Sequence, residues 1–103
     1  MYDIYIGNAI AEDFKLLFSF TEKAHNELFT FMDSIKYNNY KMLNEIREYN
    51  NSVNFFPNEI VILKSELNYI NGIKKGIQFS NALEKACNEA IKSNLELICS
   101  GEK

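Results

Sequence analysis

The sequence predicts a single helix-rich α+β domain, in which a two- to three-stranded sheet packs against about four helices. Both ends of the chain, Tyr2–Ile6 and Leu95–Gly101, show the alternation that is typical of strands, and helical spacing dominates between them. A length of 103 residues suits one domain. Four glycines and one proline are too few for the turns of a many-stranded barrel or sandwich.

The first segment, Tyr2–Ile6, alternates apolar side chains with others and therefore predicts a strand. Gly7 and Asn8 follow it, either as a bulge or as the end of the strand. A strand of about five residues needs a partner. We therefore expect the N-terminal strand, or a hairpin that contains it, to pair with the C-terminal strand.

The next segment, Phe14–Phe20, fits two interpretations. As a strand it would form a hairpin with the first strand through residues 11–13. As a helix it would join the following segment into one long element. The strand is favoured, because Thr21 is a good N-cap and because Glu22 and Glu27 suit the positive end of a new helix.

The first helix is expected over Thr21–Ile35, because apolar residues recur there at helical spacing: Ala24, Leu28, Phe31, Met32 and Ile35. Residues 36–54 are rich in asparagine and tyrosine. They allow a short helix near Leu43, and asparagine pairs at both ends suit turns. We expect this segment to contribute least to the core.

A second long helix should follow Pro57, with Asn58 as its N-cap and an end near Gly72. We expect it to be largely buried, because Val61 and Ile62 widen an apolar stripe made of Ile60, Leu63, Leu67 and Ile70.

The last helix should start with Asn81 as its cap and Glu84 reaching back to it. Its apolar face repeats at Leu83, Cys87, Ala90, Ile91 and Asn94.

The net charge of the chain limits the classes of molecule that we expect it to bind. The chain has 11 basic and 14 acidic residues, a net charge of −3, and residues 1–35 hold six of the acids against two lysines. An acidic chain without a basic cluster is a poor ligand for nucleic acid and a better one for a basic protein. Neither a signal-peptide pattern nor a membrane-spanning apolar run is present, so we expect a cytoplasmic protein that makes no membrane contact.

Reactive side chains form no recognisable motif. His25 is the only histidine, and no acid or cysteine stands at triad spacing from it. Cys87 and Cys99 lack metal-binding spacing and are expected to be reduced core residues. Gly72–Gly76 lacks the spacing of a phosphate loop. We therefore expect no catalytic, metal or cofactor site and no enzyme activity. A small enzyme that joins His25 to an acid or to Cys99 is the alternative.

One surface has the composition of a protein interface. Tyrosine offers a large contact area with a polar tip, asparagine offers adaptable hydrogen bonds, and carboxylates attract a basic partner. We predict a partner-binding surface made of Glu22, Glu27, Asp33, Tyr37, Asn39, Tyr40, Glu45, Glu48 and Tyr49. The alternative is that these tyrosines line the edge of the core with their hydroxyls in water.

Three stretches carry a family resemblance: MYDIYIGNAI at the start, FSFTEKAHNELF at residues 18–29, and LEKACNEAIKSNLELICSGE at residues 83–102. In these stretches the chain resembles an immunity protein of a bacterial polymorphic toxin or contact-dependent growth inhibition system. The resemblance implies a tight complex with one toxin domain, often a nuclease, whose active site is masked. It assigns no functional residue.

The alternative function is a non-enzymatic adaptor or regulatory module of phage or mobile-element origin that docks on another protein. Such a module would show the same surface. In either case we expect a protein partner, no nucleic acid, and a monomer or weak dimer.

Overall fold

The computed structural model describes residues 1–8, 10–36 and 39–101. These residues form four strands and four helices. The strands are β1 (Tyr2–Asn8), β2 (Asp13–Phe20), β3 (Ser52–Phe55) and β4 (Glu96–Gly101), and the helices are α1 (Glu22–Ser34), α2 (Lys41–Glu45), α3 (Pro57–Ile73) and α4 (Gln78–Ser93). The predicted helix-rich α+β class is confirmed, but the sheet has four strands instead of two to three.

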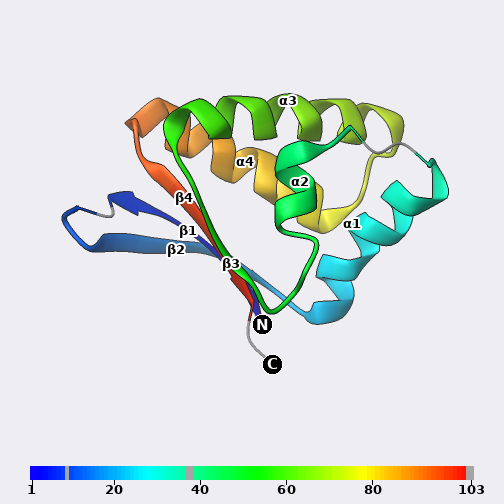
Figure 1. The fold of residues 1–103 in the computed structure, drawn as a ribbon, viewed down its shortest axis with the longest axis horizontal. Helices are drawn as coiled ribbons and strands as arrows, with labels where there is room; N and C mark the ends of the chain where they lie inside the picture. Colours follow the sequence, from blue (N-terminus) through cyan, green and yellow to red (C-terminus); the bar gives the residue numbers. More distant parts are fainter. Residues whose placement is uncertain (9, 37–38, 102–103) are drawn as a thin grey trace.

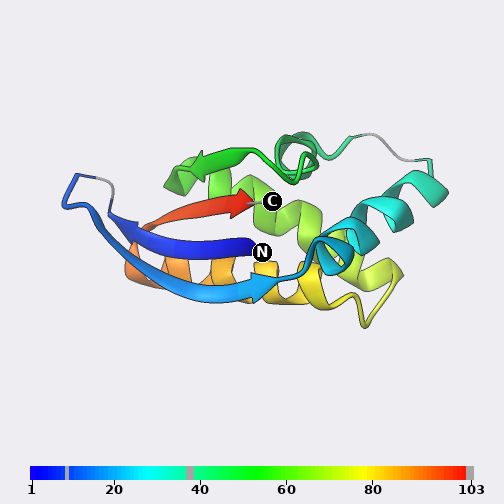
Figure 2. The same cartoon turned by 90° about the horizontal axis from the view of Figure 1, so that it is seen from below.

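The sheet is antiparallel throughout and has the order β2-β1-β4-β3. The first and last strands are its two central strands, with Ile4 opposite Cys99. The predicted pairing of the two ends is therefore confirmed, with Tyr2 opposite Gly101. The strands β1 and β4 lie side by side in both views (Figures 1 and 2).

The segment after β1 is a strand, as the favoured interpretation predicted. It forms a hairpin with β1, and α1 begins directly after it, where Thr21 Oγ1 accepts the Ala24 N–H at 3.1 Å. The strand β1 continues through Gly7 and ends at Asn8. The irregularity in its pairing with β2 lies between Ile4 and Tyr5, so Gly7 is not the bulge.

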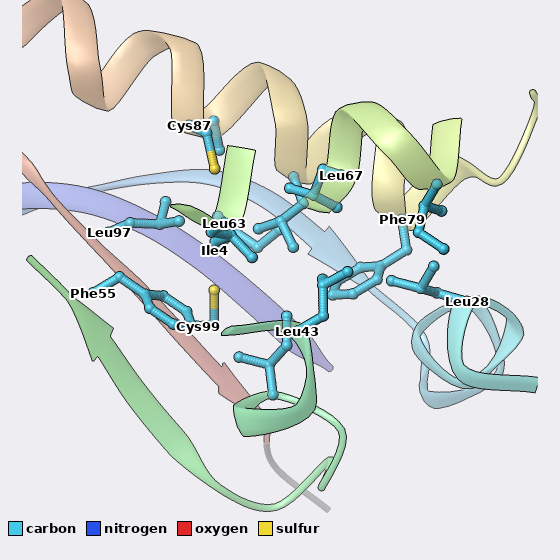
Figure 3. Packing of buried hydrophobic residues seen from close by; sticks show 14 of the residues in the cluster. Ile4, Leu28, Leu43, Phe55, Leu63, Leu67, Phe79, Cys87, Leu97 and Cys99 are labelled. Carbon is cyan, nitrogen blue, oxygen red and sulfur yellow. The ribbon is translucent and has the colours of Figure 1, made fainter. Parts of the chain in front are cut away.

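Helices α3 and α4 cover one face of the sheet (Figure 1). Figure 3 shows the packing between these layers, where Leu63 of α3 and Cys87 of α4 lie above Ile4, Leu97 and Cys99 of the sheet. All five side chains are fully buried. Burial of a leucine or isoleucine side chain contributes about 1.5–3 kcal/mol, so this layer is the main source of stability.

The apolar stripes of the long helices are confirmed in part. Each of the four stripe residues of α3 is fully buried, and so are Leu83, Cys87 and Ala90 of α4. Val61 and Ile62, however, are 57% and 47% exposed, and Ile91 is 41% exposed. The expectation that α3 is largely buried is therefore wrong, because only one side of α3 meets the sheet and α4.

The prediction that Asn58 is the N-cap of α3 is wrong. Phe56 occupies the N-cap position and Pro57 starts the helix, where a missing N–H costs no hydrogen bond. Glu59 Oε1 accepts the Phe56 N–H at 3.0 Å, which satisfies the backbone group just before the first turn. Asn58 lies inside this turn and does not cap it.

The prediction that Asn81 is the N-cap of α4 is also wrong. This helix begins at Gln78, one turn before Asn81, and Asn81 Nδ2 donates to the Ile77 carbonyl at 2.8 Å. Glu84 accepts a hydrogen bond from Asn71 at 2.8 Å instead of reaching back to Asn81. Its carboxylate therefore links α4 to α3.

The segment 36–54 is closer to the core than its composition predicted. Tyr40, Leu43 and Ile46 are at most 2% exposed, and the unpredicted strand β3 follows. The chain also passes so close to β4 that a Cβ atom on Gly101 would overlap the Tyr49 carbonyl oxygen. The prediction of a peripheral segment is wrong, because tertiary packing draws it against the sheet and α3.

The short helix α2 is held by a side chain of α3. Glu66 Oε1 accepts the Leu43 N–H at 2.9 Å, and Glu66 Oε2 accepts the Met42 N–H at 3.2 Å. These two N–H groups have no intrahelical partner. Partial burial raises the pKa of the Glu66 carboxyl above its ordinary value. The two backbone hydrogen bonds lower this pKa and offset part of the rise, and the negative charge of Glu45 raises it further.

We predict that the Glu66 carboxyl makes stability depend on pH. Because the pKa of Glu66 is higher in the folded chain than in the unfolded chain, the folded chain keeps its proton up to a higher pH. The free energy of unfolding therefore falls as the pH rises through the window between these two pKa values. The window starts at the ordinary value of 4.5 and ends at the raised value. Urea unfolding across this range should show wild type losing stability relative to Glu66→Gln, which cannot ionise.

The control is Glu89→Gln, because Glu89 is exposed on α4. A difference between wild type and Glu66→Gln that stays constant with pH, or that grows in favour of wild type, would contradict the prediction.

Candidate functional site

The three acids that the prediction assigned to the first helix are exposed on α1. Two of them line a groove of about 750 Å³, which we call the α1 groove: Glu22, Lys23, Asn26, Glu27, Thr30, Phe31, Ser34 and Lys74. All but Lys74 come from α1, and Lys74 directly follows α3. The groove therefore lies where the end of α3 meets the outer side of α1.

An aromatic ring and a cation meet in the α1 groove. The Lys74 ammonium lies 5.3 Å from the centre of the Phe31 ring, within cation–π distance. Glu22 and Glu27 add two carboxylates to the same lining, and Lys23 adds a second ammonium group. An aromatic face beside carboxylates is an environment that favours a lysine or arginine side chain.

The third acid, Asp33, belongs to a different contact. Arg47 Nη1 donates to Asp33 Oδ1 at 3.0 Å, and Arg47 Nη2 donates to Asn44 Oδ1 at 3.2 Å. The guanidinium carbon also lies 5.2 Å from the centre of the Phe29 ring. Arg47 thus ties the end of α2 and the residues after it to α1. Of the predicted residues, Glu45 is exposed at the end of α2 and Glu48 is exposed just after it.

The predicted tyrosines differ in accessibility. Tyr40 is 2% exposed, so its side chain is a core group and cannot contribute to a contact surface in this conformation. Tyr49 is half-buried against Tyr2, at 5.8 Å between ring centres. Asn39 is exposed. Tyr37 lies outside the described residues. Of this segment, Asn39, Glu45 and Glu48 therefore present accessible side chains.

His25 lies inside the protein among aromatic rings. It is fully buried, and its ring centre is 4.3 Å from that of Tyr2, 4.9 Å from that of Phe29 and 5.2 Å from that of Phe79. Its Nε2 lies 2.7 Å from the Ile46 carbonyl oxygen. Because a carbonyl only accepts, Nε2 must carry the proton and donate it. His25 is therefore a structural link between α1 and the segment after α2.

The two thiols are equally inaccessible. Cys87 and Cys99 are fully buried and not disulfide-bonded, as predicted for core residues. Burial raises the pKa of the Cys87 thiol to about 12 and also raises the pKa of Cys99. Both side chains are thus held in the thiol form, which is a poor nucleophile. Within residues 1–8, 10–36 and 39–101, no group of three or more histidine, cysteine or acidic side chains could hold a metal ion.

Sequence reasoning missed the open face of the sheet. Figure 2 shows the four strands in front of α3 and α4, with this face toward the viewer. The register places Leu16 opposite Tyr5, Tyr5 opposite Ile98 and Ile98 opposite Asn54, which makes one row across all four strands. Leu16 is 49% exposed. Alternation in β2 could have indicated two faces, but it could not show which one the helices cover.

Comparison of the chain with protein-family models, with curated proteins and with solved structures found no match. None of the helices in the described part of the chain has the length and apolar character needed to cross a membrane.

We predict that His25 contributes to stability through its ring proton. His25→Phe keeps an aromatic ring in the cluster but leaves the Ile46 carbonyl without its donor, which costs about 1–3 kcal/mol for a buried polar group. Urea denaturation monitored by circular dichroism measures the loss.

Thr30→Ala is the matched control, because Thr30 is exposed on the same helix, whereas Asn26 Oδ1 lies 3.2 Å from His25 Nδ1. Full stability of His25→Phe would show that the Ile46 carbonyl does not depend on this hydrogen bond.

Proposed function

We propose that this chain is an immunity protein, which binds a cognate toxin domain and masks its active site. A nuclease domain is the kind of toxin that fits best, because nucleases present lysine and arginine side chains for phosphates. The chain would then act by binding alone. The buried, protonated thiols and the buried imidazole support a role without chemistry of its own.

The α1 groove is the observation that carries this proposal. It is large enough for a side chain of a partner, and it combines the Phe31 ring with the carboxylates of Glu22 and Glu27. Lys74 already lies over the ring in the free chain, so the groove accommodates a cation from its own protein. In the complex, a lysine or arginine of the toxin would take this position and Lys74 would move aside.

The exposed acids around this groove favour fast association with a cationic partner. The chain carries a net charge of −3, and complementary charge raises association rates with a cationic partner. Glu45 and Glu48 are exposed on the segment that Arg47 ties to α1. These acids would extend the contact beyond the groove.

Charge reversal in the groove should weaken binding. Glu27→Lys places a cation where the partner's cation binds, and we expect at least a tenfold loss of affinity, about 1.4 kcal/mol. Isothermal titration with the purified product of the neighbouring gene, as the candidate toxin domain, measures affinity, and a growth-protection assay measures function. Glu89→Lys is the matched control, because it makes the same charge change on the exposed side of α4.

Removal of the competing cation should have the opposite effect. Lys74→Gln frees the Phe31 ring, so the toxin domain should bind more tightly, whereas Lys75→Gln makes the same charge change outside the groove lining. Equal effects of these two variants would show that only net charge matters and that the groove is not the contact. Absence of any complex with the neighbouring toxin would contradict the immunity function itself.

A further inference from the structure

A small pocket lies between α3 and the residues that lead into α2. It has a volume of about 210 Å³, and we call it the Glu66 pocket after one of its lining residues: Asn39, Tyr40, Ser65, Glu66 and Tyr69. Asn39, Ser65 and Tyr69 are exposed, so the pocket is open to solvent on their side. Tyr40 is 2% exposed and supports the pocket from below, with its ring centre 6.3 Å from that of Tyr69.

The charge in this pocket is negative and has no counter-ion. Among the residues that the structure describes, Glu66 is the only charged one in the lining. Neither Glu66 nor Glu45 has an ion-pair partner within residues 1–8, 10–36 and 39–101. Partial burial and the negative charge of Glu45 both raise the pKa of Glu66. A cation beside this half-buried carboxylate would offset its lost hydration and the repulsion from Glu45.

The Glu66 carboxylate can accept further hydrogen bonds. Each of its oxygens accepts one backbone N–H, from Leu43 and from Met42. A carboxylate oxygen has two lone pairs, so each oxygen retains the capacity for another donor. The Ser65 hydroxyl and the Asn39 amide oxygen add acceptors to the same lining. The pocket thus suits a cation that carries several N–H donors.

The size of the pocket indicates what kind of cation it holds. Pockets for drug-sized molecules measure about 300–1,000 Å³, so this smaller one suits the end of a single side chain. A guanidinium group carries five N–H donors in one plane, pairs with carboxylates and stacks on aromatic rings such as that of Tyr69. It is also less strongly hydrated than an ammonium group, so its entry into a half-buried site costs less free energy.

We propose that the Glu66 pocket binds one arginine side chain of a partner protein. None of its lining residues belongs to the α1 groove, so this is a second site and does not rest on the proposed immunity function.

Nuclear magnetic resonance titration of the full chain tests the proposal. The probe is a blocked tripeptide with arginine between two glycines, added up to about 10 mM, because a single side chain should bind with a dissociation constant of about 1 mM. Saturable shifts should appear at the amide resonances of the lining residues. The control peptide contains citrulline, which has nearly the same shape as arginine without its charge, and it should bind at least about tenfold more weakly.

Two variants test the roles of the ring and the carboxylate. Tyr69→Ala removes the ring at a 53% exposed position and should weaken peptide binding about threefold. Its matched control is Ile62→Ala, a 47% exposed position of α3 outside the pocket lining, which should bind like wild type. Glu66→Gln should abolish the saturable shifts, whereas Glu89→Gln makes the same charge change on α4 and should not.

The positions of the shifts separate this pocket from the α1 groove, which also suits a cation. Glu27→Gln should reduce any shift at Phe31 and leave the shifts at Ser65 and Tyr69 unchanged. The proposal would be overturned by wild type without saturable shifts at the pocket, by equal binding of the citrulline peptide, or by Tyr69→Ala that binds like wild type.

Circular dichroism of each variant reports whether the fold is retained. If Glu66→Gln loses helical signal, Tyr69→Ala decides the outcome, because its side chain is exposed. None of these measurements involves the toxin. Failure of the arginine peptide to bind would therefore leave the immunity function standing, and absence of a toxin complex would leave the pocket standing.

Discussion

The fold depends on the pairing of the first strand with the last. Because β1 and β4 are the two central strands, the rest of the sheet and the main helical layer attach to this pair: β2 and β3 extend it on either side, and α3 and α4 cover one of its faces. The pair also supplies Ile4, Leu97 and Cys99 to the centre of the core. Contacts between the ends of a chain close its longest loop. This closure costs conformational entropy, which only the later burial of the core offsets. The sheet and the helical layer therefore depend on each other for stability.

Polar contacts organise the middle of the chain, where apolar periodicity is weak. His25 donates to the Ile46 carbonyl, Glu66 accepts from the start of α2, and Arg47 bonds to Asp33. These contacts join residues at least 14 positions apart in the sequence. Each contact provides a hydrogen-bond partner for a polar group of the protein. Together these contacts position the core residues of this segment. The same contacts define the surface beside α1, because Arg47 fixes where the exposed Glu45, at the end of α2, and Glu48 lie.

The exposed surfaces differ in charge. The α1 groove combines an aromatic ring with carboxylates and suits a cation, whereas Val61, Ile62 and Ile73 leave apolar, uncharged side chains exposed on α3. Ile73 and Lys74 are neighbours in the chain, yet only Lys74 lines the groove. The end of α3 is thus the place where an apolar surface and the proposed cation-binding groove approach each other.

The sequence by itself determined the strands at both ends, the hairpin, the positions of the long helices and the buried side of α3, because periodic apolar residues encode these features locally. It also indicated the exposed acids of α1. Only the tertiary structure decided that His25 and Tyr40 are buried, that Ser52–Phe55 forms an edge strand, and that Val61 and Ile62 remain exposed. Periodicity marks an apolar side but not what covers it. The number of neighbours that an element meets is a property of the assembled layers, and here the sheet, α2 and α4 meet α3 on sides that leave Val61 and Ile62 exposed.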